Sequence, residues 1–294
     1  MAGVVLLGGY RVVPSQRVKA LPPKLADLRL AELDGFWVWS DEAYGRREGA
    51  LRAEVPVSRI PDGGSAALLY RMLGHGGVVA PQASAGVRNL ARPFAEEVFA
   101  LLPNGRTIHV SAPLPGGELP PFQLNADLLY VMLHGNYRDL TTFTGEDLET
   151  GESPLAVSIE DLPKPGPSVV FAGCCWGALT VGERAVEGVD GPLLTPLTAD
   201  SSIALRCLEN GANAFVGCTG AHYSPDWPDL DNYGGPMHRY FWNEIVSGSA
   251  PARALHQAKR RYESGIPHNP DASRTEEALE HKILQQFTCL GLGW

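Results

Sequence analysis

The sequence predicts an α/β protein with a mostly parallel sheet and helices on its faces. Short apolar, partly β-branched runs alternate along the chain with segments whose apolar residues recur at helical spacing, and this alternation is typical of such a sheet. The alternation pauses once, at the densest Pro/Gly stretch, residues 113–123. We therefore expect two half-domains, residues 1–115 and 116–294.

Strands and helices are expected in turn through the first half-domain. Residues 3–13 form an apolar strand interrupted by two glycines, and residues 36–45 form a short aromatic one. Prolines within 53–61 predict an extended segment outside the central positions of a sheet. The remaining expectations are helices over 65–74 and 91–105 and a strand over 106–113.

The second half-domain contains two strongly apolar strands, within 128–137 and 167–180. A polar loop, residues 136–152, follows the first of them, and a long acidic and aromatic loop, residues 222–236, has the composition of a site rim. The other expected elements are a helix over 201–212, a strand over 213–220, helices over 236–248 and 249–264, and a closing segment over 276–290.

Composition and charge exclude several classes of function. The net charge is −9 and no basic block stands out, which argues against nucleic-acid binding. No apolar run approaches the roughly 18–20 residues of a membrane span, and the first residues lack the basic region of a secretory signal. Five cysteines, an odd number, favour reduced thiols in a cytoplasmic protein over a disulfide framework: Cys174, Cys175, Cys207, Cys218 and Cys289.

Reactive side chains follow both of the apolar strands. His134 and Gly135 follow one, and Cys174 and Cys175 follow the other. A thiol and an imidazole at adjacent strand ends are the groups that covalent acyl transfer requires. A strand-end cysteine with a histidine some tens of residues upstream is the caspase-like arrangement.

Six short motifs extend this pattern over nearly the whole chain. In order they are VVLLGGYRVVP, WVWSDEAYG with AEVPVSRIP, LHG, AGCCWG, ENGANAFVGCTG and QQFTCLGLG. Together they resemble the gingipain-type cysteine peptidases of the caspase-like clan, and the second half also resembles the CHAT peptidases. The resemblance implies a caspase-like three-layer α/β/α sandwich with a shortened first half-domain. The chain departs from the family where Leu292 and Gly293 replace the terminal Asp-Pro.

The resemblance also implies roles for these residues. His134 would protonate the departing amine and then activate water, and Gly135 would donate its N–H to the oxyanion. The spacing from cysteine to Gly177 found in most of the clan favours Cys174 as the nucleophile. Caspase spacing, and one gingipain subtype with paired cysteines, favour Cys175 as the alternate. A rival histidine, His75, is expected to end a helix.

Substrate choice is expected to depend on the long acidic loop. By resemblance to the lysine-selective gingipains, Asp226 would bind a Lys or Arg side chain before the scissile bond; Trp176 and His222 are further candidates for substrate binding. The alternatives remain that Asp226, Asp229 and Asp231 are solvated turn residues or ligands of a structural calcium ion, and that His222 is a solvated loop residue. Three acidic residues after His134 either border the cleft or solvate a loop: Asp139, Glu146 and Asp147.

The sequence thus predicts a cysteine endopeptidase that acts on proteins or peptides through a Cys-His dyad and requires no metal or cofactor. The alternatives are a caspase-like interaction module without turnover and an effector that a partner protein activates. Core packing is expected for Cys207, Cys218 and Cys289, and surface positions for His238, His256, His268 and His281.

Overall fold

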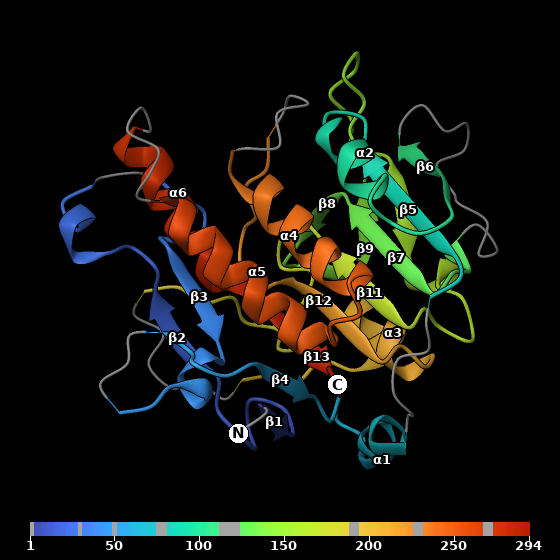
Figure 1. Ribbon diagram of the computed structural model, residues 1–294, viewed down its shortest axis with the longest axis horizontal. Coiled ribbons are helices and arrows are strands. Elements are labelled where there is room, and N and C mark those ends of the chain that lie inside the picture. The colour runs from blue at the N-terminus through green and yellow to red at the C-terminus, as the bar shows by residue number, and fades with distance from the viewer. Residues whose placement is uncertain are drawn as a thin grey trace.

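The computed structural model describes residues 3–28, 31–48, 52–74, 81–111, 124–187, 194–225, 232–266 and 273–294 (Figure 1). One eight-stranded sheet runs through it, in the order β1-β4-β13-β12-β11-β7-β5-β6. Its strands are β1 (Val4–Leu7), β4 (Val57–Ile60), β13 (Phe287–Gly291), β12 (Ala214–Cys218), β11 (Val169–Ala172), β7 (Leu128–Met132), β5 (Ser84–Asn89) and β6 (Gly105–Ser111). The predicted α/β class is confirmed.

The sheet consists of two parallel blocks that run in opposite directions. The strands from β12 to β6 are all parallel, whereas β13 is antiparallel to β12 and parallel to β4. Two smaller ladders lie beside it: β10 (Leu155–Ser158), β9 (Asp139–Thr144) and β8 (His134–Asn136) in one, and β2 (Gln16–Lys19) with β3 (Trp37–Ser40) in the other.

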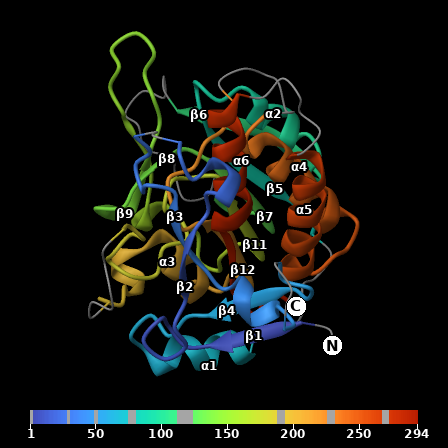
Figure 2. The same cartoon turned by 90° about the vertical axis from the view of Figure 1, so that its left-hand side faces the viewer.

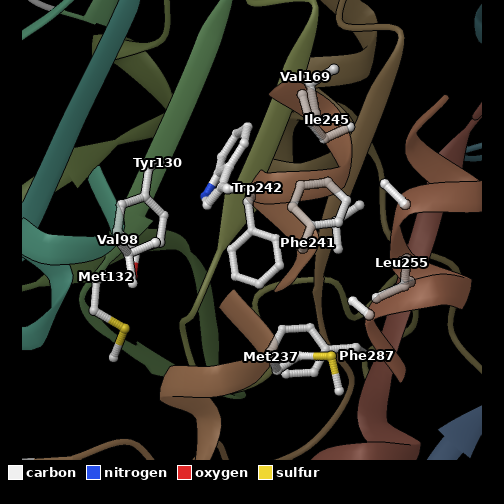
Figure 3. Close-up of a cluster of buried hydrophobic side chains, with 14 of the residues drawn as sticks. Val98, Tyr130, Met132, Val169, Met237, Phe241, Trp242, Ile245, Leu255 and Phe287 are labelled. Atoms are coloured by element: carbon white, nitrogen blue, oxygen red, sulfur yellow. The ribbon is translucent and has the colours of Figure 1, made fainter. Parts of the chain in front are cut away.

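Helices cover both faces of the sheet, which gives three layers (Figure 2). One face packs against α2 (Phe94–Phe99), α4 (Gly234–Val246), α5 (Pro251–Gly265) and α6 (Arg274–Gln286), and the other against α1 (Ala66–Gly74), α3 (Ile203–Glu209) and the β9–β10 hairpin. Because both faces are covered, all five residues of β7 are buried. Figure 3 shows the core between the sheet and α4, where Trp242 of α4 lies beside Tyr130 of β7 and Phe241 packs against Trp242.

Several predicted elements have different bounds or surroundings in the structure. The expected helix over 91–105 is shortened to α2, and the polar loop expected over 136–152 contains β9. The expectation that prolines keep 53–61 out of the inner positions of the sheet is wrong: β4 pairs with both β1 and β13, because Pro56 and Pro61 flank its four paired residues. The boundary expected at 113–123 lies outside the described residues, and strands from either side of it, β5 and β7, pair directly.

Candidate active site

Two neighbouring strands bring the histidine and cysteine stretches together. β7 and β11 are parallel, with Val131 opposite Ala172, and the N–H of Gly173 donates to the Val131 carbonyl at 2.8 Å. Both strands therefore end at the same edge of the sheet. His134 begins β8 just beyond β7, and Cys174 and Cys175 begin the turn just beyond β11.

Gly135 packs directly on the backbone of Cys175. A Cβ atom at position 135 would lie 2.1 Å from the Cys175 carbonyl oxygen and 3.3 Å from its nitrogen. Real Cβ atoms do not approach backbone atoms within 3.0 Å, so position 135 accepts only glycine without backbone movement. The sequence predicted Gly135 only as an oxyanion donor, and its close packing on the cysteine turn is a finding of the structure.

Gly135→Ala is therefore expected to separate the two loops and to lower activity on peptide substrates by at least about 100-fold, because small displacements of catalytic groups are costly. Steady-state kcat/KM measures the loss, and circular dichroism checks that the variant is folded. Gly265→Ala is a suitable control, because a Cβ atom there would have no neighbour within 4 Å and the residue does not adopt a positive φ. Full activity in Gly135→Ala would contradict the close packing.

The two adjacent cysteines have different environments. Cys174 is fully buried in the core beside α3, where burial raises the pKa of its thiol. Cys175 is only half-buried, and its Sγ accepts the His222 backbone N–H at 3.2 Å. Burial raises the pKa of the Cys175 thiol as well, but the backbone amides of His222 and Gly135 oppose that shift because they stabilise the thiolate.

The turn at Cys175 has a strained backbone. Trp176, the next residue, has a φ of +53°, which is uncommon for a residue with a side chain. Its N–H donates to the Gly220 carbonyl at 2.9 Å, and its indole Nε1 donates to Asp34 Oδ1 at 3.1 Å. Contacts on both sides thus hold a conformation of the kind that is concentrated at functional sites.

His134 forms a pair with Glu146. Its Nε2 lies 3.1 Å from Glu146 Oε2, and Asn89 Nδ2 donates to the same oxygen at 3.5 Å. The hydrogen bond with His134 lowers the pKa of Glu146, so this carboxylate is ionised at neutral pH. With Nε2 engaged, Nδ1 is the nitrogen of His134 left for a reacting group. The sequence indicated Glu146 only as a candidate for the cleft border.

His222 and His238 form a buried pair below the site. Their Nε2 atoms are 3.1 Å apart, His222 Nδ1 contacts Gln286 Nε2 at 3.1 Å, and His238 Nδ1 contacts Tyr130 Oη at 2.9 Å. Burial lowers the pKa of His222 to about 3, so its ring is neutral at physiological pH. The alternative of a solvated His222 is wrong, as is the expected surface position of His238, because both rings lie between the sheet and α4.

A buried charge cluster supports the loops around Cys175. Lys282 of α6 bonds to both Glu32 and Asp34, and all three side chains are inaccessible to solvent. Asp34 Oδ2 also accepts the Ala221 N–H at 2.7 Å, in addition to the Trp176 bond at Oδ1. Asp34 thereby connects the turn after β11 to the one after β12. No local sequence pattern marks these residues, since they meet only through tertiary folding.

A surface hollow of about 560 Å³ opens beside His134 and Trp176. Residues of β8, β9 and the following loop form most of its walls. The full lining is His134, Gly135, Asn136, Tyr137, Asp139, Thr142, Thr144, Ser153 and Trp176.

Other predicted site residues lie outside the described part of the chain, namely His75 and the acidic residues Asp226, Asp229 and Asp231.

In the part that the structure describes, no three His, Cys, Asp or Glu residues are grouped so that they could hold a metal ion. No helix among those residues has the length and apolar character needed to cross a membrane. Core positions are confirmed for Cys207, Cys218 and Cys289.

Comparison with known proteins adds no family assignment. No protein-family model matches the chain, and no curated protein does. The case for a function therefore depends on the geometry of the site.

Proposed function

We propose that this protein is a cysteine endopeptidase with Cys175 as nucleophile and His134 as general acid and base. The observation that supports the proposal is the packing of Gly135 on the Cys175 backbone, which brings the residue after His134 against the residue that carries the half-buried thiol. Cys174 is the weaker candidate because its sulfur lies in the core. Membership in the gingipain-type branch of the caspase-like clan is part of this proposal and is supported by the six sequence motifs.

In the first half of the reaction, His134 accepts the thiol proton and the Cys175 sulfur attacks the peptide carbonyl. A C–S bond forms, and the oxyanion accepts hydrogen bonds from backbone N–H groups, for which Gly135 and Cys175 are the candidates. His134 then gives its proton to the departing amine, and the C–N bond breaks to leave a thioester. Glu146 stabilises the imidazolium that exists between these two proton transfers.

In the second half, water enters beside His134, which removes one of its protons as the oxygen attacks the thioester. The C–S bond breaks, the sulfur recovers the proton and the carboxylic acid leaves. The proposed preference for Lys or Arg before the scissile bond comes from the family resemblance at Asp226. Glu32 and Asp34 are poor candidates for that role because Lys282 already neutralises them internally.

A second candidate is an effector that a partner protein activates. The observation that favours it is the burial of Cys175, which raises the pKa of its thiol and leaves little thiolate at neutral pH. A partner that opened this turn would increase access and thiolate content together. This candidate predicts low activity of the isolated chain and a large increase on addition of the partner.

A covalent labelling experiment tests the proposed nucleophile. The protein is incubated with a lysyl or arginyl chloromethyl ketone, and the modified peptide is mapped by mass spectrometry. We expect one adduct, on Cys175, with Cys174 unmodified, and no adduct in His134→Ala. An aspartyl chloromethyl ketone is the matched control for the preferred side chain. No label on either cysteine, together with no cleavage of basic-site peptides, would reject the endopeptidase in favour of a module without turnover.

A further inference from the structure

The hollow beside His134 begins at the bond that the proposed chemistry would cut. It is lined by the proposed general acid, by Gly135 next to it and by Trp176, the residue after the nucleophile. From there it extends over β9 to Thr142 and Thr144 and to Ser153. Its volume of about 560 Å³ exceeds that of any one side chain. It therefore has room for a residue and part of the next one.

The direction of proton transfer decides which half of a substrate reaches this hollow. In peptide cleavage the general acid protonates the departing nitrogen, so that nitrogen lies against its ring. The chain that continues from this nitrogen then leads away from the cysteine on the His134 side. Because the hollow lies on that side, it suits the residues that follow the scissile bond and not those that precede it.

The walls of the hollow indicate the side chain that it suits. Tyr137 and Trp176 meet edge to face, with ring centroids 5.2 Å apart, and form an aromatic wall. Asp139 is exposed, and its carboxylate accepts the Thr141 N–H at 3.0 Å and the Thr142 hydroxyl at 2.8 Å. Although burial opposes the shift, these hydrogen bonds lower the pKa of Asp139, so the carboxylate is charged at neutral pH.

No cation among the described residues forms an ion pair with Asp139. The two arginines that contact Tyr137 have other partners: Arg138 donates to the Tyr137 hydroxyl at 3.0 Å, and Arg184 lies over the Tyr137 ring, 4.5 Å from its centroid, and pairs with Asp34 at 3.5 Å. Neither arginine lines the hollow. Because both arginines already lie over the Tyr137 ring, the groups of the lining that favour a basic side chain are the Asp139 carboxylate and the hydroxyl groups.

We infer that this hollow is a subsite for the residue after the scissile bond and that it selects Lys or Arg there, with Asp139 as the specificity residue. The inference rests on the proposed function and adds a second, independent preference to it. It assigns a role to the β8–β9 hairpin, which the dyad chemistry does not use.

Acyl transfer to added amines tests the subsite separately from the nucleophile. A blocked arginine ester acylates Cys175, and an added amine then competes with water for the thioester. The amine nitrogen forms the new C–N bond, the C–S bond breaks, and His134 passes the amine proton to the sulfur. The ratio of amide to acid product measures binding of the amine next to His134.

Two amines of almost equal shape, argininamide and the neutral citrullinamide, give the comparison. We expect argininamide to be captured about ten-fold better, as for one charge-assisted contact. Asp139→Asn is expected to remove this advantage. Ser153→Lys, at an exposed lining position that requires no repacking, is expected to reduce it as well, so the test does not depend on one variant that could misfold. Glu149→Gln removes an exposed carboxylate outside the hollow and is the control.

Three outcomes would overturn the inference. Equal capture of both amines would show that the hollow does not distinguish a charged side chain from a neutral one. A preference unchanged in both Asp139→Asn and Ser153→Lys would place the selective site elsewhere. In both of these outcomes ester hydrolysis persists, so the proposed peptidase function is retained. Absence of both ester hydrolysis and chloromethyl ketone labelling would reject the proposed function and the subsite together.

Discussion

Alanine at position 175 is expected to lower kcat/KM for basic-site peptides by at least about 10³-fold, because it removes the proposed nucleophile and the neighbouring Cys174 sulfur lies in the core. Alanine at position 174 is expected to leave most of the activity and to lower the melting temperature, because that sulfur fills space in the core. Kinetics with fluorogenic peptides and thermal unfolding of each variant separate the two effects.

Two controls make this comparison decisive. Cys207→Ala removes a different buried thiol, which lies on α3 and has no role in the proposed chemistry. It should therefore resemble Cys174→Ala. His134→Ala should resemble Cys175→Ala, since residues that act as one unit lose activity together. The reverse result, activity lost in Cys174→Ala and kept in Cys175→Ala, would move the nucleophile to Cys174 and require the turn to rearrange.

Lys282→Met is expected to destabilise the fold by about 3–5 kcal/mol, the usual cost of removing one partner from a buried ion cluster. Methionine keeps most of the volume of lysine, so the loss arises mainly from Glu32, which would remain buried without a cation, whereas Asp34 would keep Arg184 at 3.5 Å. Denaturant unfolding at pH 7 measures this change in the free energy of unfolding. Arg47→Ala breaks an exposed pair with Glu54 and should cost no more than about 1 kcal/mol.

The pH dependence of the same comparison identifies the cause. Burial alone would raise the pKa of Glu32, but Lys282 lowers it below the unfolded value of 4.5. The stabilisation is therefore complete above pH 4.5 and is lost as the pH falls through the lower folded pKa. The difference between wild type and Lys282→Met should thus be smaller at pH 3.5 than at pH 7. An equal difference at both pH values would attribute the loss to packing instead.

The sequence was most informative where a pattern is local. The apolar runs that became β7 and β11 and the helix within 201–212 that became α3 were predicted from residue type and spacing. The same strands placed His134 and the cysteines at one sheet edge, because parallel neighbours end together. These predictions needed no knowledge of distant contacts.

One further signal was present in the cysteine strand. Val170, Ala172 and Cys174 alternate along the chain and share the face that packs on α3, as the two-residue period of a strand requires. Continuing that alternation directs Cys174 into the core and Cys175 away from it. Periodicity therefore distinguishes the two cysteines better than their spacing from Gly177 does.

Other parts of the site could not be predicted, because they depend on contacts between distant segments. Asp34 meets Trp176 and Lys282 only after the chain segment that contains β2 and β3 has packed across the site edge. His222 and His238 belong to a loop and to the buried face of α4, and nothing in either segment reveals that their rings face each other. Hydropathy also cannot report burial of residues that are polar.

The reversal of strand direction at β13 has a consequence for the order of assembly. β4 and β1, near the start of the chain, pair with each other but join the rest of the sheet only through β13, which is synthesised much later and pairs with β12. The ammonium that neutralises Glu32 and Asp34 is carried by the helix just before β13 and arrives equally late. A nascent chain thus cannot fix the turn that holds Cys175 before synthesis has passed residue 291, and the proposed peptidase activity would arise only after that point.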